Sequence, residues 1–164
     1  MPITNKLTAS YLAGLIDGEG CIEILKRKRP ECKRKIYYCA RLRISNSNKD
    51  LIEWLKNSFG GWIEKREIGG NYKDAYVWVI TYSKIEPLLI KILPYLKVKK
   101  KQGEILRKFL KTFKEENYFL VEQKKGEWKN GGTAWHREIK EKTWDYREEL
   151  YRQIRELNKK GFAR

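Results

Sequence analysis

Two carboxylates, Asp17 and Glu19, lie close together near the start of the chain, in the segment YLAGLIDGEG at residues 11–20. Apolar residues in that segment recur at the i, i+3, i+4 spacing of one helical face, which predicts a helix ending at the glycines. The C-terminus of a helix carries partial negative charge, so two acids there need compensation. Divalent cations such as Mg²⁺ prefer carboxylate oxygens, so the pattern indicates a metal ligand. The alternative is an ordinary buried helix with an acidic last turn.

The charge of the chain points to a polyanionic partner. Its 164 residues include 37 Lys and Arg against 21 Asp and Glu, which gives a net charge of +16. Such an excess predicts attraction to phosphate groups, and acidic membranes are the competing target. We expect no membrane partner, because no apolar run approaches the roughly 20 residues of a spanning helix. An acid at a helix end in so basic a chain suggests metal-dependent chemistry on a nucleic-acid backbone.

The cysteines and the histidine exclude other kinds of site. Cys21, Cys32 and Cys39 are odd in number and fit no zinc spacing, so we expect free thiols in a reducing compartment. His136 is the only histidine, which argues against a His-based zinc site or a Ser-His triad. The N-terminal residues lack the apolar core of a secretion signal, so we expect an intracellular protein, cytoplasmic or organellar.

The pattern of the remaining chain predicts one α+β domain over residues 1–164. Strands are expected at 21–25 and 36–45, a helix near 49–58 capped by Asn48 or Ser47, and strands at 62–68 and 74–82. Helices are expected from 83 to 93, at 99–115 and at 143–160, whereas 117–142 is expected to be mostly loop. Both faces of strand 74–82 are apolar, so the sequence does not show which one is inward.

The segment Leu12–Gly20, read LAGLIDGEG, resembles the signature of the LAGLIDADG homing endonucleases in seven of nine letters. It departs from the signature at Gly18, in place of Ala, and at Glu19, in place of Asp. The motif occurs once, which is similar to the single-motif, homodimeric branch. Weaker echoes extend the resemblance over about residues 8–115, at 42–46, 83–88 and 93–102. The resemblance implies an αββαββα fold whose antiparallel sheet forms a DNA-binding saddle, with extra C-terminal helices.

The resemblance also implies roles for individual residues. Glu19 and the Gly18 carbonyl would hold Mg²⁺, with Mn²⁺ or Ca²⁺ as alternative occupants, and Glu19, Asn46 and Lys99 would be catalytic. Asn46 stands where the family has a water-orienting residue, and Lys99 where it has a charge-stabilising lysine. The alternative for Lys99 is a solvated side chain among neighbouring lysines. The predicted dimer interface consists of Ala13, Gly14 and Asp17, with Asp17 bonding the partner's backbone.

The predicted DNA contacts lie on the strands and on the loop between the first two. In strand 36–45, basic residues alternate with apolar ones, which predicts one face on a core and one basic face. A β-ribbon fits the major groove, where arginine can bond guanine in a bidentate way. The alternative is a solvated basic face that contacts only phosphates. The predicted contacts are Glu23, Arg27, Arg29, Lys33, Tyr37, Arg41, Arg43, Glu64 and Arg66.

These expectations combine into a homodimeric, intron-encoded homing endonuclease. It would make a staggered double-strand break in a long, near-palindromic DNA site by metal-dependent phosphodiester hydrolysis. The alternative is a non-cleaving binder on the same fold, either an intron RNA maturase or a DNA-binding regulator. A pure binder has no need of an acid beside phosphates, so Glu19 favours cleavage without excluding intron RNA as a further partner.

Overall fold

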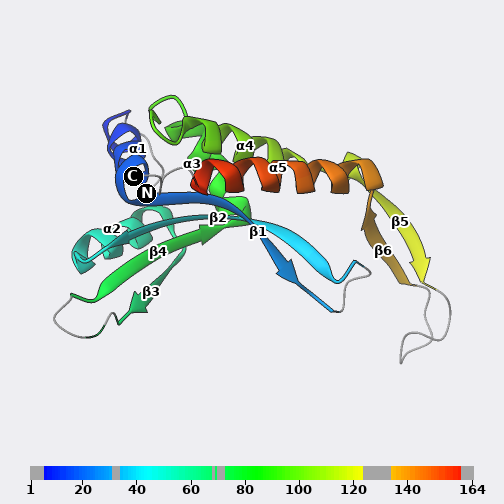
Figure 1. The fold of residues 1–164 in the computed structure, drawn as a ribbon, viewed down its shortest axis with the longest axis horizontal. Coiled ribbons are helices and arrows are strands. Elements are labelled where there is room, and N and C mark those ends of the chain that lie inside the picture. Colours follow the sequence, from blue (N-terminus) through cyan, green and yellow to red (C-terminus); the bar gives the residue numbers. More distant parts are fainter. Residues whose placement is uncertain (1–5, 31–33, 68, 70–72, 124–133, 160–164) are drawn as a thin grey trace.

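The computed structural model describes the chain except for residues 1–5, 31–33, 68, 70–72, 124–133 and 160–164. The elements follow in the order α1 (Lys6–Glu19), β1 (Gly20–Lys28), β2 (Ile36–Asn46), α2 (Lys49–Phe59), β3 (Trp62–Arg66), β4 (Ala75–Thr81), α3 (Ile85–Ile92), α4 (Lys100–Lys111), β5 (Tyr118–Gln123), β6 (Ala134–Ile139) and α5 (Glu141–Lys159) (Figure 1). The expected αββαββα order, followed by further helices, is confirmed. None of the described helices has the length and hydrophobicity that a membrane span needs.

The main sheet is antiparallel, has four strands and follows the order β1-β2-β4-β3. Its register decides which face of β4 points inward. Ile80 lies opposite Leu42 and Trp78 opposite Ile44, and directly opposed residues share a face. Trp78 and Ile80 therefore point to the same side as the buried residues of β2, and the alternate residues of β4 point to the other side.

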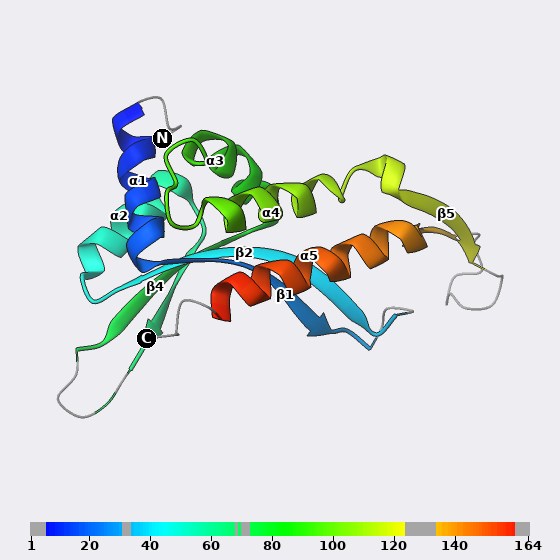
Figure 2. The same cartoon turned by 45° about the horizontal axis from the view of Figure 1, so that its top comes forward.

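The helices cover one face of this sheet (Figures 1 and 2). The core between them is apolar, and the largest of its fully buried side chains are Trp78, Phe109, Leu12, Ile16, Ile22, Leu42, Ile44, Ile52, Leu55, Ile80, Ile85 and Leu89. In Figure 1 the strands curve below the helices, and no described helix lies under them. We call this uncovered surface of the four strands the open face.

Helix α2 begins and ends close to the residues that the sequence indicates. Asn48, rather than Ser47, is the N-cap, and its side chain accepts a hydrogen bond from the Leu51 amide at 3.1 Å. Gly60 follows the helix with a φ of 74°, a conformation that glycine adopts at little cost. Helix α4 ends at Lys111, earlier than expected, and α5 starts at Glu141.

The expectation of mostly loop over residues 117–142 is wrong. Strands β5 and β6 pair there as an antiparallel hairpin that extends away from the main sheet (Figure 1). Its pattern was hidden because neighbouring residues on opposite faces, Phe119 and Leu120, are both exposed, at 45% and 63%. Without one buried face, the strand has no alternation to reveal it.

A buried arginine joins this hairpin to the helices. Arg147 of α5 donates from Nε to Thr112 Oγ1 at 2.8 Å and from Nη2 to the Thr112 carbonyl at 3.0 Å. Nη2 also donates to the Tyr118 hydroxyl at 2.8 Å, and the guanidinium lies 4.2 Å from the centre of the Phe113 ring. A buried charge is tolerated when hydrogen bonds and ring faces replace water. Arg147 therefore holds α4, α5 and β5 together.

We expect Arg147→Leu to lower the free energy of unfolding by about 2–4 kcal/mol, because Thr112 and Tyr118 lose a buried donor. This corresponds to a fall in Tm of roughly 5–15 °C in thermal denaturation followed by circular dichroism. The matched control is Arg152→Leu on the same helix, whose side chain is 68% exposed. Equal melting temperatures for the two variants would contradict the anchoring role of Arg147.

Candidate functional site

Glu19 is the last residue of α1, and its side chain is exposed. The next residue, Gly20, opens β1 and pairs with Ile44 of β2. A Cβ atom on Gly20 would lie 2.6 Å from the Ile16 Cα, so only glycine allows the strand to leave the helix so closely. This close approach places the Glu19 carboxylate at the junction of the motif helix and the sheet.

Asp17 binds its own chain. Its carboxylate accepts hydrogen bonds from the backbone amides of Lys97 at 2.7 Å and Lys99 at 2.8 Å. The ammonium group of Lys99 donates in turn to the Asp17 carbonyl oxygen. The sequence analysis expected Asp17 to bond the partner's backbone, whereas within this chain both of its carboxylate oxygens accept from the segment before α4.

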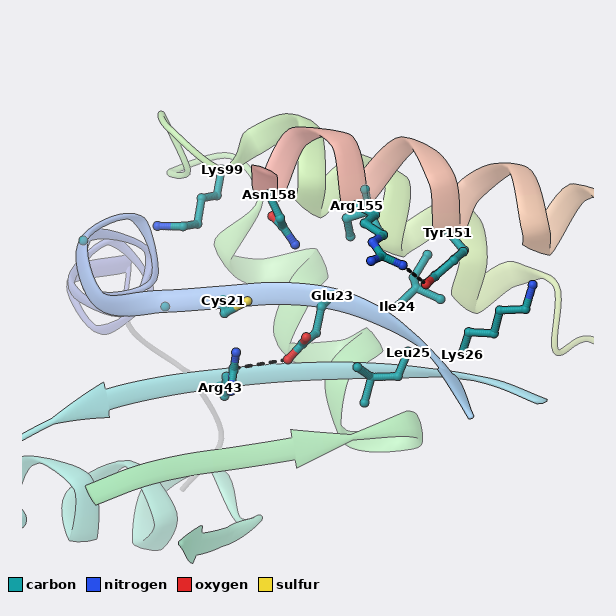
Figure 3. A pocket seen from close by; sticks show the side chains of 13 residues that line it. Cys21, Glu23, Ile24, Leu25, Lys26, Arg43, Lys99, Tyr151, Arg155 and Asn158 are labelled. Atoms are coloured by element: carbon teal, nitrogen blue, oxygen red, sulfur yellow. Dashed lines mark hydrogen bonds and ion pairs between the residues drawn. The ribbon is translucent and has the colours of Figure 1, made fainter. Parts of the chain in front are cut away.

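We call these hydrogen bonds of Asp17 with Lys97 and Lys99 the Asp17 clamp. They fix the position of Lys99. The residue is half-buried and bonded to the last turn of α1, two residues before Glu19, so the alternative of a freely solvated lysine does not hold. Figure 3 shows its side chain extending from the start of α4 toward α1. The ammonium group also compensates the negative end of the helix.

Asn46 is the last residue of β2, at the end of the sheet where α1 meets β1. It alternates with Ser45 and shares the face of Ile44, which is the side of the helices. Its side-chain oxygen accepts from the Asn48 amide at 2.8 Å. The oxygen is therefore engaged in the turn before α2, and the NH₂ group is what Asn46 can offer to a water or a phosphate.

The open face gathers most of the predicted DNA contacts. Cys21 pairs with Arg43 and Glu23 with Arg41 across β1 and β2, and Glu64 of β3 lies opposite Val77 of β4. Register and alternation together place on this face Glu23, Arg27, Tyr37, Arg41, Arg43, Glu64 and Arg66. Arg29 follows β1, with its guanidinium 5.9 Å from the centre of the Tyr37 ring. Lys33 lies outside the described residues.

Glu23 orients two of these arginines. Its Oε1 accepts from Arg41 Nε at 2.8 Å, and Arg43 Nε lies 3.2 Å from the same oxygen. The Glu23 side chain is 15% exposed, so the pairs are less screened than surface ion pairs. Glu23 thus holds both guanidinium groups in place on the open face before any ligand arrives.

Burial raises the pKa of the Cys21 thiol, and the negative charge of Glu23 raises it further. Cys21 is therefore protonated at neutral pH and is not a thiolate nucleophile. Cys21 and Cys39 are free thiols, as expected, and Cys32 lies outside the described residues.

A groove of about 700 Å³ runs along the outer edge of β1, between the end of α1 and helix α5. Its lining comprises Gly18, Gly20, Cys21, Glu23, Ile24, Leu25, Lys26, Arg43, Lys99, Tyr151, Ile154, Arg155 and Asn158 (Figure 3). Sequence reasoning missed Arg155 and Asn158, because it predicted only a helix over these residues. Tyr151 and Ile154 form an apolar stripe on that helix. The same helical spacing places Arg155 and Asn158 beside that apolar stripe and could have indicated them.

The exposed side of α1 is apolar or small, with Leu7, Tyr11, Gly14 and Gly18 at successive turns. Leu7 is 73% exposed and Tyr11 53%. We call this surface the α1 face. Gly14 lies on it, with nothing within 4 Å of a Cβ atom built there. Ala13 is fully buried within its own chain, so its assignment to the dimer interface is wrong: it points away from the α1 face.

Comparison with known proteins relates this chain to one family by its sequence and to solved structures by its fold. A family model described as LAGLIDADG endonuclease matches residues 12–130. No curated protein matches the sequence significantly.

Solved structures share the fold. The homing endonuclease I-CvuI in complex with its target in the presence of 2 mM Ca is 18% identical, with a TM-score of 0.69 over 93% of this chain and 82% of that chain. I-CvuI in complex with the I-CreI target in 2 mM Mg, with the DNA not cleaved, is 22% identical, with a TM-score of 0.60 over 67% and 69%. The archaeal intron-encoded homing endonuclease I-Vdi141I complexed with DNA is 16% identical, with a TM-score of 0.68 over 92% and 84%. At these identities the likeness establishes the fold.

We expect Asp17→Asn to destabilise the protein by about 1–2 kcal/mol. An amide offers one oxygen to two backbone N–H groups and turns an NH₂ donor toward the other. Chemical denaturation measures the change, with Asp50→Asn in the first turn of α2 as the control. An Asp17→Asn protein as stable as the wild type would show that the clamp does not hold the segment before α4.

Proposed function

Because the chain belongs to the LAGLIDADG endonuclease family, we propose that it is a homodimeric, site-specific DNA endonuclease. It makes a staggered double-strand break in a long, near-palindromic target by metal-dependent hydrolysis. A two-fold symmetric protein reads two half-sites related by the same symmetry, which is why the target would be near-palindromic.

One observation carries this proposal. The exposed carboxylate of Glu19 stands where the motif helix enters a sheet whose open face bears Arg27, Arg41, Arg43 and Arg66. A basic, uncovered sheet supports binding of a duplex, and a carboxylate at its end supports chemistry on the phosphates. The solved structures that share the fold are described as DNA complexes.

The donor set suits a hard divalent cation that is shared between chains. Among the described residues, no group of three Asp, Glu, His or Cys side chains could hold a metal within one chain. Mg²⁺ accepts one or two carboxylates when phosphate oxygens and waters complete its shell. Glu19 and the Gly18 carbonyl of each of two copies, together with DNA phosphates, would meet that requirement. When bound, the cation lowers the pKa of a coordinated water and neutralises phosphate charge.

The other residues of the site act on the phosphate and the water. The Lys99 ammonium, held by the Asp17 clamp, stabilises negative charge on the scissile phosphate. The NH₂ group of Asn46 donates to the attacking water or to a phosphate oxygen, since its oxygen is engaged by Asn48. Water attacks phosphorus, the bond to the 3′ oxygen breaks, and the 5′ phosphate stays on the other fragment.

A second copy of this chain is the partner that best fits the α1 face. The face joins exposed Leu7 and Tyr11 to two glycines, and Trp54 of α2 extends it, with its ring 5.8 Å from that of Tyr11. Glycines on a helix surface allow two backbones to approach closely. Pairing of two α1 helices would also bring the two Glu19 residues together, which the metal requires.

We expect Glu19→Gln to abolish cleavage while leaving DNA affinity within a few-fold of wild type. The amide keeps the shape of the side chain and removes the charge that binds the cation. Target sites are first selected by the wild-type protein with Mg²⁺ from a randomised duplex library. Cleavage and binding of those sites by both proteins are then measured.

Glu53→Gln, on helix α2, is the control for loss of one exposed carboxylate. A wild-type protein that binds the library but selects no cleaved site would favour the alternative, a DNA-binding regulator or an intron RNA maturase. Cleavage by Glu19→Gln at the wild-type rate would refute the catalytic assignment.

We expect Gly14→Leu to give a stable monomer. A side chain at this position meets nothing in its own chain, and replacing a mid-helix glycine stabilises a helix by about 0.5–1 kcal/mol. Between two packed helices, however, leucine would force the backbones apart. Sedimentation measures the assembly, with Lys108→Leu on the exposed side of α4 as the control. The idea fails if the wild type is monomeric with its DNA, or if Gly14→Leu remains dimeric.

A further inference from the structure

The outer edge of β1 carries a feature that the proposed function leaves unused. Strand β1 is the last strand of the sheet, and α5 runs beside its free edge. The Asn158 side chain donates to the Ile22 carbonyl at 3.1 Å, and Lys26 pairs with Glu148 at 2.8 Å. Helix α5 is therefore fastened to the edge strand at two levels, and the groove described above remains between them.

The four-stranded sheet is wider than the major groove of a DNA duplex bound on the open face. Adjacent strands are about 4.8 Å apart, so the axes of four strands span about 14 Å. The major groove is about 12 Å wide and is bounded by two phosphate backbones. The four strands do not fit within it side by side. One of the two outer strands, β1 or β3, is therefore expected to lie against a backbone, and β1 is bordered by a groove with cationic side chains.

The charges in the groove suit a phosphate chain. Its acidic lining residue, Glu23, is neutralised by Arg41 and Arg43, and its basic residue Lys26 is neutralised by Glu148. Two further cations in the lining, Lys99 and Arg155, are bonded to neutral oxygens. Lys99 donates to the Asp17 carbonyl, and Arg155 Nη1 donates to the Tyr151 hydroxyl at 2.8 Å. Both keep positive charge available for an anion.

The groove is also continuous with the candidate active site. Gly18 and Gly20, on either side of Glu19, both line it, and Lys99 lies in it. Figure 3 shows Arg155 farther along α5, between Asn158 and Tyr151, on the side that faces β1. A strand of DNA with one phosphate at Glu19 can therefore continue past Lys99 toward Arg155.

We propose that the groove along the edge of β1 holds a phosphodiester backbone of the bound DNA, with Arg155 of α5 as a phosphate contact. The proposal rests on the proposed function only in taking duplex DNA as the ligand. It assigns α5, which the sequence analysis predicted only as a C-terminal helix, to the DNA-binding surface. A contact of this kind is indifferent to base sequence and contributes affinity for any duplex.

The test compares variants of the full chain on a short, mixed-sequence DNA duplex, with Ca²⁺ in place of Mg²⁺. Arg155→Ala should weaken binding about tenfold per chain, the equivalent of one charge-assisted hydrogen bond. It should also lower the slope of log affinity against log salt by about 0.9. Arg155→Gln keeps a donor for Tyr151 and should lose the same slope, whereas Arg155→Lys should retain it.

The matched control is Arg152→Ala on the same helix, whose guanidinium lies 3.5 Å from Glu148 and is 68% exposed. It should bind like the wild type. The inference is overturned if Arg155→Ala and Arg152→Ala behave alike, if affinity falls without a change in slope, or if Arg155→Ala weakens binding of structured RNA only. In those cases selection of cleaved sites by the wild type still tests the proposed function. A wild-type protein that binds no duplex would overturn both.

Discussion

The close approach of β1 to the last turn of α1 at Gly20 is the constraint on which the rest of the site depends. Because the strand starts within contact of Ile16, the helix axis and the sheet are joined with no intervening loop. The carboxylate of Glu19 is therefore presented by rigid elements on both sides. Rigid elements hold a reacting group more reproducibly than a loop would, and chemistry on phosphate depends on that positioning.

The Asp17 clamp fixes a distant part of the chain, the segment before α4, against the motif helix. A carboxylate at a helix C-terminus would be unfavourable alone, yet here it accepts two backbone N–H groups and its own carbonyl accepts from Lys99. The motif thus uses its two acids differently. Asp17 accepts hydrogen bonds from backbone amides of its own chain, whereas Glu19 remains exposed and available to a cation.

The basic residues of the sheet, of the edge of β1 and of the interior of α5 differ in their bonding partners, and so in their roles. On the open face, Glu23 orients Arg41 and Arg43, which suits contacts that depend on direction. At the edge of β1, Arg155 and Lys99 are bonded to neutral oxygens, which suits phosphates. Buried Arg147 has a third task, since it joins α4, α5 and β5 through Thr112, Tyr118 and Phe113.

The sequence by itself determined the features that depend on neighbouring residues. The motif helix, the cap at Asn48, the hairpin of β1 and β2, and the basic alternation of β2 all follow from spacing and local chemistry. The order of the elements and the family followed from the same short patterns. These signals act over a few residues, so they survive without knowledge of the fold.

Tertiary structure alone decided the features that depend on distant residues. Lys99 meets Asp17 from 82 positions away, and Asn158 meets Ile22 from 136 positions away. Both faces of β4 are apolar, and only its pairing with β2 assigned Trp78 inward. The hairpin of β5 and β6 escaped prediction because neither of its faces is buried at Phe119 and Leu120. In each case the deciding quantity is a pairing register or a contact between separate elements, which no local pattern encodes.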